Sequence, residues 1–445
     1  TVGAARERSF DMTAIPTREE LTDAIRKRRA WAIETLGDLV REPTMLGQEA
    51  SGQKRLAAIY SALGYDVRTE PISRKKIEGR PGFSPVDWPL DGKENLVAIH
   101  DPGEKAGRSL AFNGHIDVVS PEPVSLWSSP PFEPRVVENE EDGETWMYGR
   151  GTGDMKGGTT SFLWALAALQ DLGFEPASPV IFQSPVEEEC SGNGSLAILA
   201  NGHVADACII PEPFGETVLR RQVGVIWFTV RVIGKTTHVL AAGRGVNAIE
   251  KSWLIIRAMR ELEEEINRPE NVPEAYSDID HPANLNVGII QGGDWASTVA
   301  GECAVHFRIG LFPRQRCEDV MAKIEDRVRR VAESDPWLRE SPPRVEYSGF
   351  QAEGCELDLD GDFGLMLRET HREWRGKDPE ELSATATTDA RYFNLYHDIP
   401  VTCYGPVARD IHGVDEKVSI DSMQRVAEVM ADFTGRWCGL RRMKR

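Results

Sequence analysis

Four short apolar runs, each bounded by glycine, proline or aspartate, limit the folds open to this chain more than any other feature. Runs of this kind are typical of buried strands. The segment Gly157–Leu172 lies between the second and third runs, and its apolar residues recur at helical spacing. A helix between two buried strands predicts a crossover connection and an α/β fold. The runs are Asn95–Ile99, Ser109–Phe112, Val180–Gln183 and Ala207–Ile210.

Helical spacing also occurs on both sides of this core. It predicts surface helices over Arg18–Val40 and Gln48–Leu63 near the start of the chain. Towards the other end it predicts a helix over Gly364–Glu373, a strand over Val401–Tyr404 and a terminal helix over Ser419–Trp437. We expect these late elements to return to the same α/β unit.

The pattern changes at about Thr217, where an alternating strand, a long helix, two further strands and another helix follow one another. This order is typical of a small α+β unit. With 445 residues and 40% hydrophobic content, the chain is long enough for two cores. We therefore predict a first domain formed by residues 1–216 and 347–445, with residues 217–346 inserted as a second domain. The inserted elements are expected at 223–234, Val246–Asn267, Asn284–Ile290, Glu302–Phe312 and Cys317–Ala332.

The charge balance excludes several classes of partner. The formal net charge is −19, so polyanions are repelled at long range. We therefore expect a small-molecule substrate, and neither nucleic acid nor a membrane surface. The seven cysteines are scattered without paired spacing and are expected to be reduced thiols. The start of the chain lacks the apolar centre of a signal peptide, which predicts a cytoplasmic protein.

Polar side chains with metal-ligand chemistry follow the predicted strands. His115 and Asp117 come after the second run, two residues apart, so that an imidazole nitrogen can bind a metal while the carboxylate orients the ring. Asp154 stands in a glycine-rich turn just before the predicted crossover helix. A phosphate-binding loop is the alternative for this turn, but the required order of glycine and lysine is absent, and Asp154 would repel phosphate.

Three consecutive carboxylates, Glu187–Glu189, come directly after the third run rather than after a charged helix. Adjacent carboxylates at a strand end can divide the roles of metal ligand and proton carrier. Glu212 and His412 also follow predicted strands. Together these residues would supply nitrogen and oxygen ligands for two divalent ions that share one aspartate.

Six ordered motifs resemble those of the co-catalytic zinc aminoacylase and carboxypeptidase family. Its members include acetylornithine deacetylase, succinyl-diaminopimelate desuccinylase, glutamate carboxypeptidase and aminoacylase. The resemblance runs from about Arg18 to Trp437. It implies a zinc-exopeptidase-like catalytic domain, with a mixed central sheet flanked by helices, and an inserted ferredoxin-like α+β domain that serves as a dimerisation or lid domain. The motifs are HIDVV, GRGTGDMKGG, EEECSGNG, PEP, GKTTH with GRGVNAI, and IHGVDEKVSI.

The resemblance implies a ligand set for two zinc ions. His115 and Glu212 would bind one ion, and Glu189 and His412 would bind the other. Asp154 would bridge both.

The resemblance also implies a general base. Glu188 would take a proton from metal-bound water, leave hydroxide to attack the amide carbon, and return the proton to the leaving amine. Counting back from Gly194 sets this register within the glutamate run, and Glu187 is the alternative base. Asp117 would hold His115 in the tautomer that binds metal.

Three further residues are expected around the substrate. His238, in the GKTTH motif, would be an oxyanion donor that reaches across a dimer, and an exposed loop histidine is the alternative. Arg308 and Arg391 stand where the family would place substrate-facing groups, because a guanidinium fork suits a carboxylate. Either arginine could instead form a structural ion pair. The family's Asn-Val-Pro pattern is replaced here by Gly292–Ala300, which bears on carboxylate recognition.

We therefore predict a hydrolase of C–N bonds, a deacylase or metallopeptidase that cleaves an amide bond of an N-acyl amino acid or short peptide with a free carboxylate. Two divalent ions per chain are expected, zinc first, with cobalt or manganese as alternatives. A homodimer through the inserted domain is also expected. Two alternatives stay open. One is a hydrolytic deaminase that uses the same dimetal site on a non-peptide amine, for example an aromatic one, and the other is an inactive dimeric binding scaffold.

Overall fold

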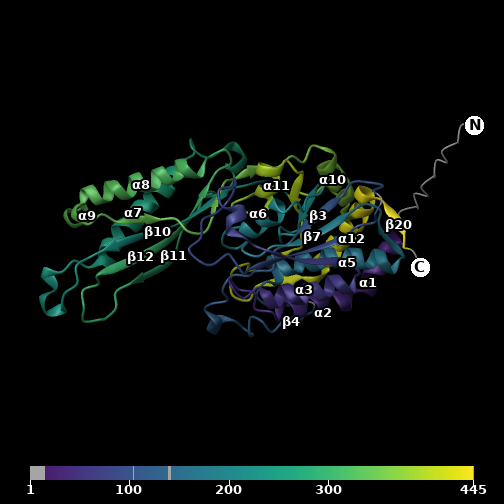
Figure 1. The fold of residues 1–445 in the computed structure, drawn as a ribbon, viewed down its shortest axis with the longest axis horizontal. Coiled ribbons are helices and arrows are strands. Elements are labelled where there is room, and N and C mark those ends of the chain that lie inside the picture. The colour runs from purple at the N-terminus through teal and green to yellow at the C-terminus, as the bar shows by residue number, and fades with distance from the viewer. Residues whose placement is uncertain (1–15, 104, 139–141, 444–445) are drawn as a thin grey trace, which may run out of the picture.

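A mixed six-stranded sheet forms the centre of the larger part of the molecule (Figure 1). The structure is a computed structural model that describes residues 16–103, 105–138 and 142–443. Four neighbouring strands run parallel, and the two strands at one edge are each antiparallel to the next. All four predicted apolar runs are confirmed as adjacent strands of this sheet. In spatial order the strands are β1 (Asp66–Pro71), β2 (Glu94–His100), β7 (Val180–Ser184), β3 (Leu110–Asn113), β8 (Cys208–Ile210) and β17 (Val401–Cys403).

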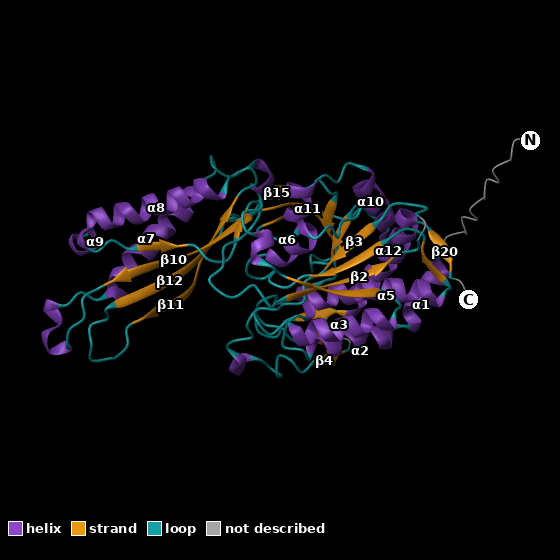
Figure 2. Cartoon of the chain, in the orientation of Figure 1, coloured by secondary structure: helices purple, strands orange, loops and turns teal. Residues whose placement is uncertain are grey.

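Helices flank this sheet (Figure 2). The predicted crossover helix is α5 (Gly158–Asp171), which is buried along most of its length and packs against α12 (Ile420–Cys438). Gly158 allows α5 to begin close against the loop that follows β8, because a Cβ there would lie 1.9 Å from the carbonyl oxygen of Pro211. The other helices of this part are α1 (Arg18–Lys27), α2 (Arg29–Val40), α3 (Ala50–Ala62), α4 (Arg74–Ile77), α6 (Asn193–Ala200), α10 (Asp362–Arg375) and α11 (Ala390–His397).

The single helix predicted over Arg18–Val40 is two helices in the structure, α1 and α2. Thr17 and Glu20 form a capping box that starts α1. The break falls at Arg28, whose backbone leaves helical geometry with φ −91° and ψ 2°. The Arg28 guanidinium binds the carboxylate of Asp171 at the end of α5. Apolar spacing continues through the break, so the sequence pattern did not reveal it.

A second, antiparallel sheet projects to one side and has its own core (Figure 1). Alternate residues of β10 (Gly224–Ile233) face two ways: Phe228 lies in the core and stacks on Phe307 at 4.9 Å, whereas Trp227 and Thr229 point to the opposite face. The helices α7 (Ala248–Ile266) and α8 (Cys317–Ser334) pack on the core face. The short α9 (Pro336–Glu340) follows α8. The strands are β10 (Gly224–Ile233), β11 (Leu285–Gly292), β12 (Glu302–Leu311), β13 (Arg344–Glu346) and β14 (Gln351–Ala352).

A small three-stranded sheet lies where the two parts meet. It consists of β9 (Val218–Gln222), β15 (Cys355–Glu356) and β16 (Glu381–Ala384), none of which the apolar pattern predicted. Leu219 still belongs to the first core, and Val223 already belongs to the second. The domain boundaries at residues 217 and 346 stay a prediction.

Two further small sheets bring distant segments together. One pairs β20 (Leu440–Arg442) with β6 (Phe174–Pro176). The other contains β4 (Arg135–Val137), β5 (Trp146–Tyr148), β18 (Ala408–Arg409) and β19 (Lys417–Ser419). The second of these sheets places the IHGVDEKVSI motif beside the glycine-rich turn at 149–158, because β19 pairs with β5. Two of the predicted chemical motifs therefore meet through β5 and β19, two strands that the sequence pattern did not predict.

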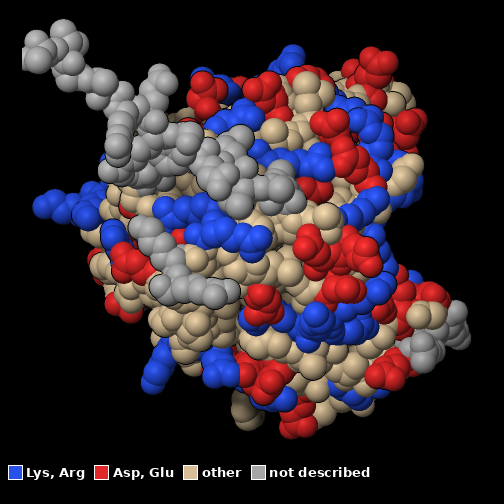
Figure 3. Space-filling view, turned by 90° about the vertical axis from the view of Figure 1, so that its right-hand side faces the viewer, with Lys and Arg blue, Asp and Glu red and all other residues tan. Residues whose placement is uncertain are grey.

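The surface carries charges of both signs (Figure 3), and the cysteines lie inside the molecule. Acidic and basic side chains are interspersed on the face shown in Figure 3. All seven cysteines are buried, and none forms a disulfide. Within the described residues, no helix combines the length and apolar character that crossing a membrane requires.

Candidate dimetal active site

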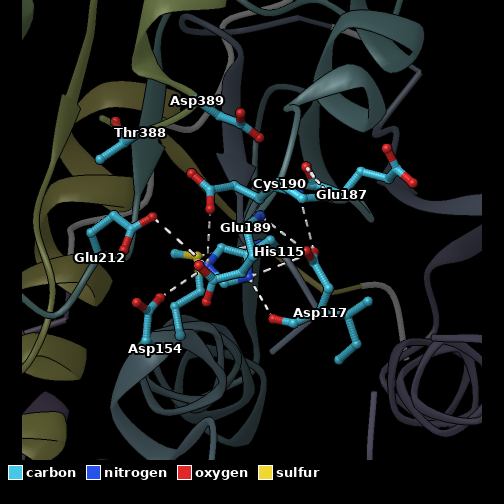
Figure 4. A network of polar contacts seen from close by, with 12 residues as sticks. His115, Asp117, Asp154, Glu187, Glu189, Cys190, Glu212, Thr388 and Asp389 are labelled. Carbon is cyan, nitrogen blue, oxygen red and sulfur yellow. Dashed lines mark hydrogen bonds and ion pairs between the residues drawn. The ribbon is translucent and has the colours of Figure 1, made fainter. Parts of the chain in front are cut away.

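Imidazole and carboxylate groups converge at the carboxyl ends of the parallel strands (Figure 4). His115 follows β3, the glutamates at 188 and 189 follow β7, and Glu212 follows β8. Asp154 lies in the turn that leads into α5. Neighbouring parallel strands end at the same edge of a sheet, so loops far apart in the sequence meet there.

Asp154 stands between the two imidazoles. Its Oδ1 lies 3.0 Å from Nε2 of His115, and its Oδ2 lies 3.3 Å from Nε2 of His412. The His115 ring also approaches Glu212, at 4.0 Å, and the His412 ring approaches Glu189, at 3.1 Å. The donors thus form two groups that share one carboxylate. Of these, donor atoms of His115, Asp154 and Glu189 all lie within 4.8 Å of one another, close enough to hold an ion.

Electrostatics support cation binding at this cluster. Burial raises the pKa of Glu188 and that of Glu212 well above their usual range, and neighbouring carboxylates raise both further. Burial also opposes ionisation of Asp154, but hydrogen bonds with His115 and His412 hold its pKa below the usual value. Divalent cations would neutralise the crowded carboxylates and take the place of protons on the imidazoles. The donor set, imidazole nitrogen with carboxylate oxygen, therefore fits divalent metal ions.

Asp117 supports the site differently from the sequence prediction. Nδ1 of His115 lies 2.9 Å from the main-chain carbonyl of Asp117, whereas the Asp117 carboxylate is 3.8 Å away. The carboxylate instead accepts hydrogen bonds from the main-chain N–H groups of Glu188 and Glu189. The carbonyl orients the ring, and the carboxylate fixes the turn that carries the two glutamates.

The glutamate run divides between the cleft and the interior. Glu188 lies 3.8 Å from Nε2 of His115 and faces the cleft described below. Glu187 is fully buried, and its carboxylate binds Lys93, Trp88 and Ser191. This arrangement favours Glu188 over Glu187 as the group that can exchange protons with a substrate.

Glu416 is a buried carboxylate beside the candidate ligands that the sequence reasoning missed. Its buried carboxylate accepts hydrogen bonds from the main-chain N–H groups of Gly151, Gly153 and Asp154. It also forms an ion pair with Arg150 at 2.5 Å. The same arginine also donates to the carbonyl of His412, at 3.4 Å. One ion pair therefore fixes the loops of two candidate ligands. Its position four residues after His412 was the only sequence signal.

A cleft of about 710 Å³ opens beside the cluster. One wall carries Glu188, Glu189 and His412, and the opposite wall is the outward face of the second sheet. The cleft thus lies between the two parts of the chain. Further lining residues include Trp88, Trp227, Thr229, Asn286, His306, Arg308 and Phe350.

The three remaining predicted residues have different positions. Arg308 lines the cleft. Arg391 is buried, donates to the carbonyls of Thr388 and Ser191, and is absent from the cleft wall. His238 is exposed beyond the far end of β10, where its Nδ1 accepts the N–H of Leu240 and caps a short turn. The structure brings neither Arg391 nor His238 to the cleft of the same chain.

Histidines and carboxylates gathered at the carboxyl edge of a mixed sheet are typical of a metal-dependent hydrolase. Residues 111–436 match the family model described as Peptidase family M20/M25/M40. This match covers most of the chain, so the chain belongs to Peptidase family M20/M25/M40, and the family resemblance seen in the sequence motifs is confirmed.

Individual relatives agree with this assignment. The chain is 30% identical over 380 residues to N-formyl-4-amino-5-aminomethyl-2-methylpyrimidine deformylase of Bacillus subtilis, covering 80% of this chain and 86% of the relative. It is 26% identical over 409 residues to succinyl-diaminopimelate desuccinylase of Caulobacter vibrioides, covering 89% and 93%. The fold is similar to that of the dipeptidase Dug1p from Saccharomyces cerevisiae, with a TM-score of 0.79 at 15% identity, covering 95% and 98%. The predicted fold class is confirmed.

We expect Glu416→Gln to weaken divalent metal binding by about 10- to 100-fold, because an amide cannot accept all the donors that Glu416 holds. A chelator competition titration with zinc measures the affinity. Glu428→Gln is the matched control, since Glu428 is a buried carboxylate on α12 that pairs with Arg375 instead. An equal loss of affinity in both variants would show that Glu416 has no special part in the site.

Proposed function

We propose that the protein is a metal-dependent amidohydrolase that cleaves an amide bond of an N-acyl amino acid or short peptide with a free carboxylate. One observation carries the reaction: Asp154 presents one oxygen to each of two imidazoles, with Glu188 beside them at the cleft. Membership of a family of amide hydrolases and the N-acyl compounds in the names of two relatives support this choice.

The candidate ligands divide into two sets around Asp154. His115 and Glu212 would hold one divalent ion, and Glu189 and His412 would hold the other. When bound, such ions polarise the carbonyl of the amide and lower the pKa of water. Zinc suits this nitrogen and oxygen donor set, and cobalt and manganese are also compatible with it.

Glu188 is the proton carrier in this proposal. Its carboxylate takes a proton from the attacking water as the new C–O bond forms at the amide carbon. It then gives the proton to the amide nitrogen as the C–N bond breaks, so that an acid and a free amine leave. Asp117 fixes the main chain of the glutamate turn during both transfers.

Arg308 is the proposed receptor for the substrate carboxylate. Its guanidinium is held by the carbonyls of Asn284 and Thr385, each at 3.1 Å. No carboxylate of the described residues forms an ion pair with it. A fixed, half-buried cation at the cleft wall favours an anionic group on the substrate.

Aromatic walls favour a second candidate, a non-peptide aromatic amine or its N-acyl derivative. Trp227 packs edge to face on Phe350 at 5.3 Å, and both line the cleft together with Trp88. Flat aromatic surfaces of this kind suit a planar ring. The Bacillus subtilis relative carries a pyrimidine in its name, which adds weight to this alternative.

We expect about two divalent ions per chain and release of a free amino acid from at least one N-acyl amino acid or dipeptide. Elemental analysis gives the metal content, and hydrolysis is screened over N-acetyl, N-succinyl, N-formyl and N-carbamoyl amino acids, dipeptides and arylamines, with zinc, cobalt or manganese. Ammonia from an arylamine would instead establish deamination. Fewer than two ions with no turnover on any compound would favour the inactive scaffold.

Glu188→Gln is expected to lower turnover by about 10²- to 10⁴-fold while metal content stays unchanged, because the amide cannot carry the proton. Steady-state rates and elemental analysis on the same sample measure both quantities. Glu263→Gln, at a buried carboxylate that caps the start of β11, is the control. Retained activity in Glu188→Gln would remove Glu188 from the proposed role.

Arg308→Met is expected to raise KM for carboxylate-bearing substrates by about 10- to 100-fold, since a charged hydrogen bond is lost. Substrates without a carboxylate should keep their KM. Arg231→Met serves as the control, because Arg231 lies on the same sheet but pairs with Glu302 and Glu346. An equal rise in KM for charged and neutral substrates would contradict carboxylate recognition by Arg308.

A homodimer through the second sheet completes the proposal. Trp253, Ile290, Trp295 and Leu240 are large apolar residues of this part that stay exposed, between 47% and 90%. Such exposure on one part of a chain is typical of an interface. Because His238 lies away from the cleft of its own chain, a dimer would let it act as oxyanion donor in the cleft of its partner.

His238→Ala is expected to lower turnover by about 100-fold without loss of metal. Mixing this variant with Glu188→Gln, followed by dissociation and reassociation, should restore about one quarter of the wild-type rate, because half of the dimers are mixed and each has one intact site. The unmixed variants, treated identically, are the controls. No gain in rate on mixing, with exchange verified by mass, would place His238 outside the partner's site.

A further inference from the structure

A connecting segment at 78–93, between α4 and β2, supplies one wall of the cleft. Trp88 lies in this segment and is half-buried at the cleft. Its indole N–H donates to Oε1 of Glu187 at 2.7 Å. The position of an aromatic wall is thus tied to the residue next to Glu188.

Glu187 is occupied on both oxygens. Nζ of Lys93 lies 2.5 Å from Oε1, and the Ser191 hydroxyl donates to Oε2 at 2.7 Å. The side chain is fully buried, and the residue has a left-handed φ of 70°. That conformation turns the Glu187 carboxylate inward, while Glu188 faces the cleft. Lys93 also binds Glu49 at 2.9 Å, so this cation stays paired with a second carboxylate.

The main chain of the same segment is held at several other points, among them the N–H of Asp87, which donates to the Ser348 hydroxyl at 3.1 Å. The main chain of Ser84 exchanges two hydrogen bonds with the side chain of Asn193, at 3.1 and 2.8 Å. The N–H of Gly349 donates to the carbonyl of Pro85 at 2.8 Å. These contacts hold the main chain of the segment, and the Trp88 ring also packs against the apolar residues of the first core. Only the bond to Glu187 fixes the indole among the hydrogen bonds of the described residues.

We infer that Glu187 is a positioning residue that holds the Trp88 indole as a wall of the cleft beside Glu188 and thereby sets which substrates fit. The inference rests on the proposed function, since the cleft must take a substrate. It explains why a carboxylate that cannot reach the cleft stands at the start of the glutamate run. Glu187 touches no reacting group in this scheme. Its effect reaches the substrate through the ring of Trp88.

The test compares KM with kcat in three variants on a substrate that the wild-type protein turns over. Trp88→Phe keeps a ring but loses the donor, and it is expected to raise KM about 10-fold with kcat within about two-fold of wild type. Glu187→Met should raise KM at least as much. Glu187→Gln retains an oxygen that can accept the indole N–H, so its KM should stay within about three-fold of wild type.

Trp374→Phe is the matched control, because the Trp374 indole donates to the Asp432 carboxylate at 2.8 Å outside the cleft. Its KM should not change. In the double variant Trp88→Phe with Glu187→Met, KM should rise no more than in the single variant with the larger rise. The reason is that both changes remove the same hydrogen bond. If Glu187→Met does not fold, Trp88→Phe and its control still decide the question.

Equal KM values in Trp88→Phe and Trp374→Phe would overturn the inference, and so would fully additive losses in the double variant. A fall in kcat at constant KM would also overturn it, because that result would place Glu187 in the chemical step. Absence of turnover by the wild-type protein on every substrate would overturn the proposed function and this inference together. Wild-type turnover separates the two failures.

Discussion

Repulsion between buried carboxylates at one edge of an apolar sheet is the constraint that organises this molecule. This repulsion is offset first by main-chain hydrogen bonds and by one cation. Glu416 accepts hydrogen bonds from three N–H groups of the glycine-rich turn and pairs with Arg150. Asp117 gathers two more from the glutamate turn. The carboxylates of Glu416 and Asp117 therefore hold the backbone of two turns. The remaining carboxylates are left to face the candidate metal site. So many carboxylates at one site favour the binding of cations.

The architecture follows from two patterns in the sequence. Continuous apolar runs specify a sheet covered on both sides, and alternation in β10 specifies a sheet with one covered and one open face. Trp227 and Thr229 on the open face therefore reach the cleft, while Phe228 anchors the strand in its own core. The cleft needs no dedicated element, because it forms where the open face meets the carboxyl ends of the central strands.

Much of this could be predicted from the sequence, since strand runs and motif order are local signals. The candidate ligands were predicted because each comes after a predicted strand or stands in a recognisable turn, and the family resemblance of the motifs divided them between two ions. Glu416 was missed because its role depends on β19 pairing with β5, which no local pattern announces. The orientation of Glu187 was equally hidden, because a left-handed φ at a glutamate follows from the packing around it. Arg308 and Arg391 looked alike in sequence, and only burial separated them.

The two separate cores give the cleft one more property. Glu188 is carried by the first core and Arg308 by the second, and the two meet only across the cleft. Under the proposed function, a substrate that engages both residues spans a gap whose width is fixed by how the cores sit on the β9–β10 junction. The fixed width of this gap would then select the scissile bond by its distance from the charged end of the substrate. A longer substrate would place the same bond at Glu188, the one nearest its charged end, whatever groups the rest of the substrate carries.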